Sequence, residues 1–416
     1  MTGVPAPDRR VALVVTIVGG LAFVVLAVLL VPWHPVPGGT PDPVPASSVF
    51  TAEQIARGED YARWARIWSW SSLAVSLVVS CVLGFSRWGP RLVGRLRGWW
   101  WVRVVLAVAA VVVIGRVITL PFAVLMRRHV LDNGLSNQAW SGFAADLVRT
   151  EGVQIVATSV LLVVLVGCAR RWRRAWPAVA GGLLGALVLL GSFVYPVIVE
   201  PIFNDFTSLP DGPLRTEVLQ LAEREGVPVD DVLVADASRR TTTLNAYVSG
   251  FGGTRRVVLY DNLVDDVPRD QALSVVAHEL AHAKHDDVRT GSLLGAAGAV
   301  FGVGLLALVL GALAARGRPE MRDPAVVPLV LALLAVGTLL ASPVQNTISR
   351  QIETRADVDA LEVTRDAAAF EAVQRQLALR SLADPTPPRI TQLWFGSHPI
   401  GLSRIAIARQ LDERGF

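Results

Sequence analysis

His278, Glu279 and His282 form a His-Glu-x-x-His motif within the segment Val276–His282. On an α-helix, residues four positions apart lie on one face, so both imidazoles can bind one metal ion. The bond from each histidine nitrogen to a zinc ion would be about 2.0–2.1 Å long. The carboxylate of Glu279, one residue along the helix, can face a metal-bound water instead of the metal. The motif therefore predicts two zinc ligands and the general base of a metallopeptidase.

The residues around this motif favour a helix. The segment Asp266–Asp270 offers capping residues and a proline near a helix start, and residues 271–284 contain neither Gly nor Pro. An ordinary helix with a chance match is the alternative interpretation. It is disfavoured because three of the six histidines in the chain fall within residues 278–285.

A catalytic zinc site needs a third protein ligand and one position open to water. One class of zinc peptidases has a third histidine ten residues after the first, but Val288 stands at that position. His285 shares a face with His278, although three ligands from one helix rarely complete a tetrahedron, so a solvated or supporting role is the alternative. Glu353 and Asp357 lie four residues apart on a predicted helix. They could supply a ligand and an acceptor that orients a ligating histidine, or simply a solvated face.

The rest of the chain is unusually apolar. Hydrophobic residues make up 52% of it and charged residues 18%, which is too apolar for a typical soluble protein. A proline-rich loop, 32–48, follows the first apolar segment without a small-residue cleavage signature, so we interpret that segment as a retained span. Seven segments are long enough to cross a bilayer: 11–31, 68–86, 99–126, 153–169, 175–199, 291–315 and 325–344.

Polar stretches between and after these spans define the expected organisation. We expect a five-span N-terminal membrane region (1–199), a catalytic insert with the His-Glu-x-x-His helix (200–290), two further spans (291–344) and a C-terminal part with Glu353 (345–416). The insert and the C-terminal part must come together to complete one site. The predicted fold class is therefore a mainly α, polytopic membrane protein with a split α+β catalytic domain.

Several further motifs are spread along the chain: Gly134–Gln138, Glu200–Thr207, Asn245–Tyr247 with Gly250-Phe-Gly, Arg256–Leu263, Asn346 and Ser349-Arg350 before Glu353, and Ser397-His398-Pro399 before Arg404. Together with the zinc motif, they resemble the type I CAAX prenyl endopeptidases, integral-membrane zinc metalloproteases that trim prenylated proteins. Two positions depart from the family pattern, namely Ile400 after the Ser-His-Pro segment and Ala281 in the zinc helix. Neither departure removes a functional group.

The resemblance implies a zincin-like site with one Zn²⁺ per chain, beside seven helices that enclose a chamber. It implies that Glu353 is the third ligand and that Asp357 orients a ligating histidine. It also implies that His398, with Arg404 close behind, stabilises the oxyanion of the tetrahedral intermediate. A structural hydrogen bond in a proline-containing turn is the alternative role of His398.

Asn245, Ala246 and Tyr247 are candidate substrate-binding residues. Residues 245–251 and 256–260 are predicted strands joined through Gly252-Gly253, and the first would be an edge strand beside the zinc helix. An extended peptide could add to this edge through main-chain hydrogen bonds. A plain structural hairpin is the alternative.

The function predicted from these features is a membrane-embedded zinc metalloendopeptidase, similar to the CAAX prenyl proteases. A catalytically inactive sensor or scaffold and a transporter with a structural zinc site are the alternatives. Expected partners are a peptide or protein substrate, lipidated or not, and membrane lipid. The net charge of +4 is modest and the arginines flank spans, so nucleic acid is not an expected partner. Lys284 is the sole lysine, which suggests a GC-rich, bacterial genome, where protein prenylation is not generally expected.

The two indications of sidedness disagree for this multi-pass protein of the cell membrane. The positive-inside rule places the arginines after the second and fourth spans in the cytoplasm and the catalytic domain outside. The family resemblance implies a cytosolic site. Arg116, deep in the third span, could pair with an acid or line a water-filled cavity. Cys81 and Cys168 lie in predicted spans and offer no disulfide framework.

Overall fold

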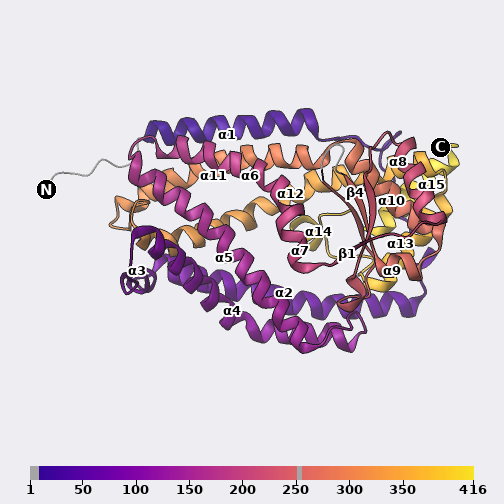
Figure 1. Ribbon diagram of the computed structural model, residues 1–416, viewed down its shortest axis with the longest axis horizontal. Coiled ribbons are helices and arrows are strands. Elements are labelled where there is room, and N and C mark those ends of the chain that lie inside the picture. Colours follow the sequence, from indigo (N-terminus) through magenta and orange to yellow (C-terminus); the bar gives the residue numbers. More distant parts are fainter. Residues whose placement is uncertain (1–8, 251–254) are drawn as a thin grey trace.

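Long helices form one end of the molecule, and a small sheet with shorter helices forms the other (Figure 1). The structure is a computed structural model that describes residues 9–250 and 255–416. Seven helices among these residues are long and apolar enough to cross a membrane, the number expected from the sequence. The chain enters at the end away from the sheet and finishes beside it (Figure 1).

The spanning helices coincide with the predicted apolar segments, apart from one or two residues at some ends, and several extend well beyond them. α12 has 38 residues and is therefore about 57 Å long, against about 30 Å for the hydrocarbon core of a bilayer. Its second half leaves the apolar layer as a continuous helix and carries Glu353. The spanning elements are α1 (Arg9–Leu30), α2 (Ala52–Phe85), α4 (Trp100–Asp132), α5 (Trp140–Arg171), α6 (Trp176–Val194) with the π-helical turn η2 (Tyr195–Val199) and α7 (Glu200–Phe203), α11 (Asp287–Ala314) and α12 (Val327–Thr364).

Small residues let α1 lie directly against α11. A Cβ atom added at Gly19 would overlap the backbone of Phe301, and one added at Gly304 would overlap the backbone of Thr16. Helices in a membrane associate through such close packing, because burial from lipid supplies little hydrophobic drive. The first span is thereby fixed to the helix that follows the His-Glu-x-x-His segment.

Four strands form a mixed sheet in the order β1-β2-β4-β3. β2 and β4 are parallel, and β1 and β3 pair antiparallel on the two outer sides. The strands are β1 (Phe206–Ser208), β2 (Asp231–Ala235), β3 (Ala246–Ser249) and β4 (Arg256–Tyr260). The predicted antiparallel pairing of the last two strands is present, whereas Phe251, Gly252 and Gly253 lie outside the described residues.

One face of the sheet packs against helices to form a second core, apart from the one between the spanning helices. Val232, Val257 and Leu259 are fully buried there, together with Leu263 and Leu280 from two of those helices. The shorter helices are α3 (Trp88–Gly94), α8 (Pro213–Arg224), α9 (Asp261–Asp266), α10 (Arg269–Lys284), α13 (Ala367–Ser381), α14 (Arg389–Phe395) and α15 (Gly401–Glu413), with 3-10 turns η1 (Ala46–Ser48), η3 (Ala237–Arg239) and η5 (Pro324–Val326).

The proline-rich loop is bound to the C-terminal helices. The Val44 amide donates to the carbonyl of Leu402 at 3.3 Å, and Arg414 donates to the carbonyl of Pro37 at 2.6 Å. Val36 is buried in a cluster that includes Phe370. The loop that follows the first span is thus packed against the C-terminal part of the chain.

Candidate active site

Helix α10 presents its two histidines to α12. The helix begins after Pro268, with Asp270 in its first turn, where a negative charge complements the helix dipole. One side of α10, including Val276 and Ala277, is completely buried in the core, which fixes the rotation of the helix. His278 is also buried, with 7% of its surface exposed.

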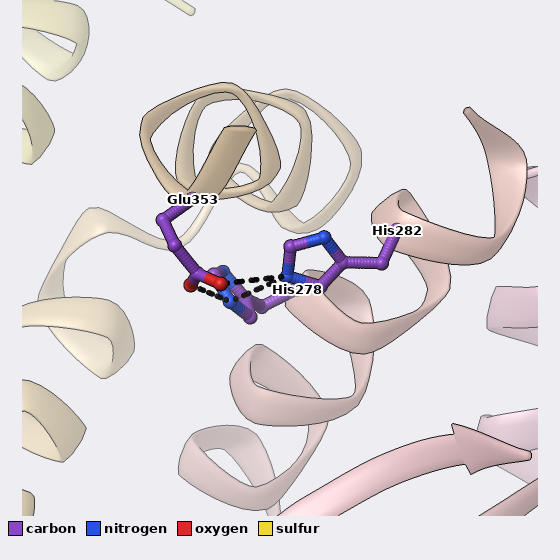
Figure 2. A group of neighbouring side chains, drawn as sticks. All are labelled: His278, His282 and Glu353. Atoms are coloured by element: carbon purple, nitrogen blue, oxygen red, sulfur yellow. Dashed lines mark hydrogen bonds and ion pairs between the residues drawn. The ribbon is translucent and has the colours of Figure 1, made fainter. Parts of the chain in front are cut away.

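Three potential ligand atoms converge from these two helices (Figure 2). The Nε2 atoms of His278 and His282 lie 3.2 Å apart. Glu353 Oε2 lies 3.2 Å from His278 Nε2, and Glu353 Oε1 lies 3.6 Å from His282 Nε2. Ligand atoms that hold one ion tetrahedrally at 2.0–2.1 Å are about 3.3 Å apart. The donor set and its spacing therefore fit a tetrahedral zinc ion with one position left for water.

A carboxylate backs each histidine. His278 Nδ1 lies 2.9 Å from Asp357 Oδ1, and His282 Nδ1 lies 2.9 Å from Asp287 Oδ2. Such pairs fix the ring orientation and keep the proton on Nδ1, which leaves Nε2 free to bind a metal. Asp357 is fully buried, and Arg404 Nε donates to its Oδ2 at 2.8 Å.

Asp287 was not found by sequence reasoning. It is the first residue of α11, five residues after His282, and Arg355 pairs with its second carboxylate oxygen. The sequence feature that could have identified Asp287 is its position five residues after the second histidine of the motif.

The pKa values of Glu279 and His282 are both shifted upward, but for different reasons. Burial raises the pKa of the Glu279 carboxyl, although the two histidines oppose that effect. Burial lowers the pKa of His282, but its interactions with Asp287 and Glu353 outweigh burial and raise the pKa to about 10. A cation at the three ligand atoms therefore has to displace a proton from His282.

His398 reaches the same centre from the segment between α14 and α15. Its Nε2 lies 3.3 Å from Glu353 Oε2, and 60% of its side chain is exposed, so a substrate can touch it. The backbone around it is held in place: Gln392 donates to the carbonyl of His398 at 2.6 Å, and Arg350 donates to the carbonyl of Gly396 at 2.6 Å. These contacts explain the Ser349-Arg350 motif. The Arg350 side chain holds the backbone near His398, and none of its described hydrogen bonds is to His278, His282 or Glu353.

The outer edge of β3 is open for pairing. The Tyr260 amide donates to the carbonyl of Asn245 at 3.0 Å, and Ala246 stands opposite Leu259. Hydrogen-bonded pairs alternate along an antiparallel ladder, so the main-chain groups of Ala246 and Val248 point away from β4. Among the described residues no backbone group pairs with them. Asn245 is exposed and lines a cavity that His278 and Glu279 also line.

A network missed by sequence reasoning holds the segment before β3. Asn262 Nδ2 donates to the carbonyls of Thr243 at 2.7 Å and Thr241 at 3.4 Å. The Thr242 amide donates to the carbonyl of Leu135 at 3.3 Å. The Gly134–Gln138 motif, distant in sequence, thus supports the backbone that leads to Asn245.

The remaining candidate residues lie elsewhere. His285 Nε2 pairs with Asp359 at 2.7 Å and is not part of the three-residue group. Arg116 donates to Glu151 of the next span at 2.6 Å, one of the two roles considered for it. Cys81 and Cys168 are free.

Comparison with known proteins gives matches along most of the chain. A family model described as CAAX prenyl protease N-terminal, five membrane helices, matches residues 40–205, and peptidase family M48 matches residues 208–412. The uncharacterized metalloprotease YhfN of Bacillus subtilis (strain 168) is 29% identical over 304 residues, 71% of each chain. The CAAX prenyl protease 1 homolog of Oryza sativa subsp. japonica is 31% identical over 179 residues, 42% of each chain.

A solved structure shares the whole fold. Ste24p of S. mikatae superposes with a TM-score of 0.79 over 98% of this chain and 99% of that one, at 18% identity. The seven apolar helices and the described N-terminal region make this a multi-pass membrane protein. With the two family matches side by side along its length, the chain belongs to peptidase family M48 and carries the membrane region of the CAAX prenyl proteases.

Proposed function

We propose that this protein is a zinc metalloendopeptidase of the cell membrane, with His278, His282 and Glu353 as ligands and Glu279 as the general base. The observation that carries the proposal is the convergence of two histidine Nε2 atoms, 3.2 Å apart, on the Glu353 carboxylate. One oxygen of Glu353 lies 3.2 Å from His278 Nε2 and the other lies 3.6 Å from His282 Nε2, and Glu279 stands next to His278 on the same helix. A structural zinc site usually has four protein ligands, whereas a catalytic one keeps a position for water.

Each residue has a distinct task in hydrolysis. Zinc, when bound, supplies Lewis acidity and lowers the pKa of a coordinated water toward 7. Glu279 accepts the proton of the attacking water and passes it to the leaving amine. The carboxyl must hold the proton between the two transfers. His398, with Arg404 close behind it, stabilises the negative charge on the former carbonyl oxygen, while Arg404 itself is paired with Asp357.

The β3 edge orients the peptide in this proposal. The outward-pointing groups of Ala246 and Val248 pair with an extended chain, and Asn245 and Tyr247 contact its side chains. Asp357 and Asp287 hold the two histidines in the tautomer that the metal requires.

Metal content and activity test these assignments together. Purified wild-type protein is expected to hold about one zinc per chain. Glu353→Ala is expected to lose most of it, whereas Glu279→Gln is expected to keep the zinc and lose hydrolysis. His285→Ala, directly after the end of α10, is the matched control and should retain both. Full zinc in the Glu353 variant, or hydrolysis by the Glu279 variant, would refute the role concerned.

The proposed substrates are membrane-associated or partly unfolded peptides, with CAAX processing as a retained capability. Zinc ligands and a strand edge recognise the metal and the peptide backbone, not a lipid. A farnesylated CAAX peptide and its unmodified twin, assayed side by side in detergent, should therefore both be cleaved. Strict dependence on the farnesyl group would identify a true CAAX processing enzyme. If zinc is present and neither peptide is cut, the natural substrate is neither a CAAX peptide nor an unmodified peptide of this kind.

A further inference from the structure

A cavity of about 210 Å³ opens beside the proposed metal centre. Its walls include His278 and Glu279 on one side and His398 and Arg404 on another. A group in this cavity therefore lies directly next to the reacting bond. Most of the remaining wall is apolar: Leu244, Val275, Phe370, Val373 and Leu377.

Three uncharged polar residues line the cavity as well: Asn245, which is exposed at the β3 edge, and two residues that are buried in the apolar wall. Gln374 on α13 is 6% exposed and Ser274 on α10 is 2% exposed, and both line the cavity. Among the described residues, the Ser274 hydroxyl is buried without a hydrogen-bond partner. The Gln374 amide forms no hydrogen bond within residues 9–250 and 255–416 and lines the cavity. Buried polar groups in proteins nearly always have partners, so the missing partner points to a ligand.

The charged groups around the cavity already have an ion-pair partner or a role in the proposed reaction. Arg404 is paired with Asp357, and Glu279 belongs to the proposed reaction. A charged substrate side chain would therefore find no free counter-charge in the apolar part of the cavity. An aliphatic side chain would fill the space but leave the Gln374 amide unpaired.

We infer that this cavity receives the side chain of a residue flanking the scissile bond and that Gln374, supported by Ser274, selects an uncharged side chain with a hydrogen-bonding tip. Glutamine fits best, because a primary amide can donate to and accept from another primary amide at once. The inference rests on the proposed peptidase function. The inference predicts that the enzyme prefers glutamine over an aliphatic residue at this position of the substrate.

Peptides that differ only at the two residues flanking the cleaved bond test the inference. Glutamine, leucine and glutamate are placed at each position in turn, and kcat/KM is measured. For wild-type protein we expect glutamine to exceed leucine by about tenfold at one of the two positions, the effect of one buried polar group left unpaired. Gln374→Leu should abolish this preference and increase cleavage of the leucine peptide. Ser274→Ala should reduce the preference.

Gln376→Leu is the matched control, because Gln376 lies on the same helix but does not line the cavity. It should keep the wild-type preference. An increase for the leucine peptide is a result that misfolding does not produce, and zinc content checks each variant. If Gln374→Leu does not retain zinc, Gln374→Met repeats the comparison with a closer isostere. An unchanged glutamine-to-leucine ratio in the zinc-loaded variant overturns the inference while the peptidase function stands. Failure of wild-type protein to cleave any peptide counts against the function itself.

Discussion

At the scale of single residues, each histidine of the proposed metal centre contacts a carboxylate that is not one of the three proposed ligands. Asp287 holds His282 in the same way that Asp357 holds His278, at 2.9 Å in both cases. Loss of such a partner typically costs about 10- to 100-fold in metal affinity. Asp287→Asn is therefore expected to weaken zinc binding by that factor, measured by competition with a chelator.

Asp359→Asn is the matched control for this prediction. It removes a carboxylate from another histidine, His285, which is not in the ligand group. Zinc affinity of the control should stay at the wild-type level. Equal losses in both variants would mean that Asp287 acts through general stability and not through His282.

The sequence predicted the residues of this centre unevenly. The histidines and Glu279 follow from helical spacing, and the structure brings them together with Glu353, which needed a family resemblance to be chosen over His285. Asp287 was missed because helical periodicity stops before it. α10 ends at Lys284, and Asp286 adopts a left-handed conformation with φ of 51° at the start of the next helix. Spacing arguments do not cross such a break.

At the scale of elements, the free edge of β3 makes a specific prediction. Val248→Pro removes a main-chain N–H that points away from β4, so the ladder inside the sheet is preserved. We expect a raised KM or a loss of cleavage while zinc stays bound. Val248→Ala keeps the N–H and should remain close to wild type. Unchanged kinetics in a folded, zinc-loaded proline variant would rule out edge pairing.

Asp231 at the start of β2 ties three elements together. Its carboxylate accepts hydrogen bonds from Ser208 at 2.6 Å and Arg215 at 2.8 Å. The Ser208 bond in particular holds the pKa of Asp231 below its usual value. The stabilisation is therefore complete above the unfolded-state pKa of about 3.9 and is lost as the pH falls through the lower folded-state value.

Asp231→Asn is expected to destabilise the protein by about 1 kcal/mol at pH 7. The difference from wild type should shrink as the pH falls below about 4, where the wild-type carboxylate also becomes neutral. Thermal unfolding in detergent at several pH values measures it. Asp230→Asn, at an exposed neighbour, is the control. A difference that does not change with pH would exclude the charge of Asp231 as the cause.

Elements were predicted best where hydropathy defines them. All seven spans were found because a bilayer demands about twenty apolar residues in a row. The ends of those helices were not predicted. α12, for example, continues for a further twenty residues past residue 344 without an apolar signal. The loop 32–48 was expected to be extended, but its attachment to α15 depends on contacts between residues more than 350 positions apart.

At the scale of the whole molecule, seven spans put the two ends of the chain on opposite sides of the membrane. The connection between α2 and α4 carries four arginines and no acid, and four more surround the turn between α5 and α6. Both connections lie on the side away from the sheet (Figure 1). On the side of the sheet, residues 31–51 and 133–139 contain neither Lys nor Arg.

By the positive-inside rule, this asymmetry predicts that the arginine-rich side faces the cytoplasm, because short loops with Lys and Arg are retained there. We therefore expect the catalytic region on the outer side, against the cytosolic site that the family resemblance implies. Alkaline phosphatase fused after Phe416 should be active, and a fluorescent protein at the same position should stay dark. The same fluorescent protein fused before Met1 should be bright in cells. A bright C-terminal fusion would place Glu279 and its substrates in the cytoplasm and show that the arginines of the two connections do not set the orientation.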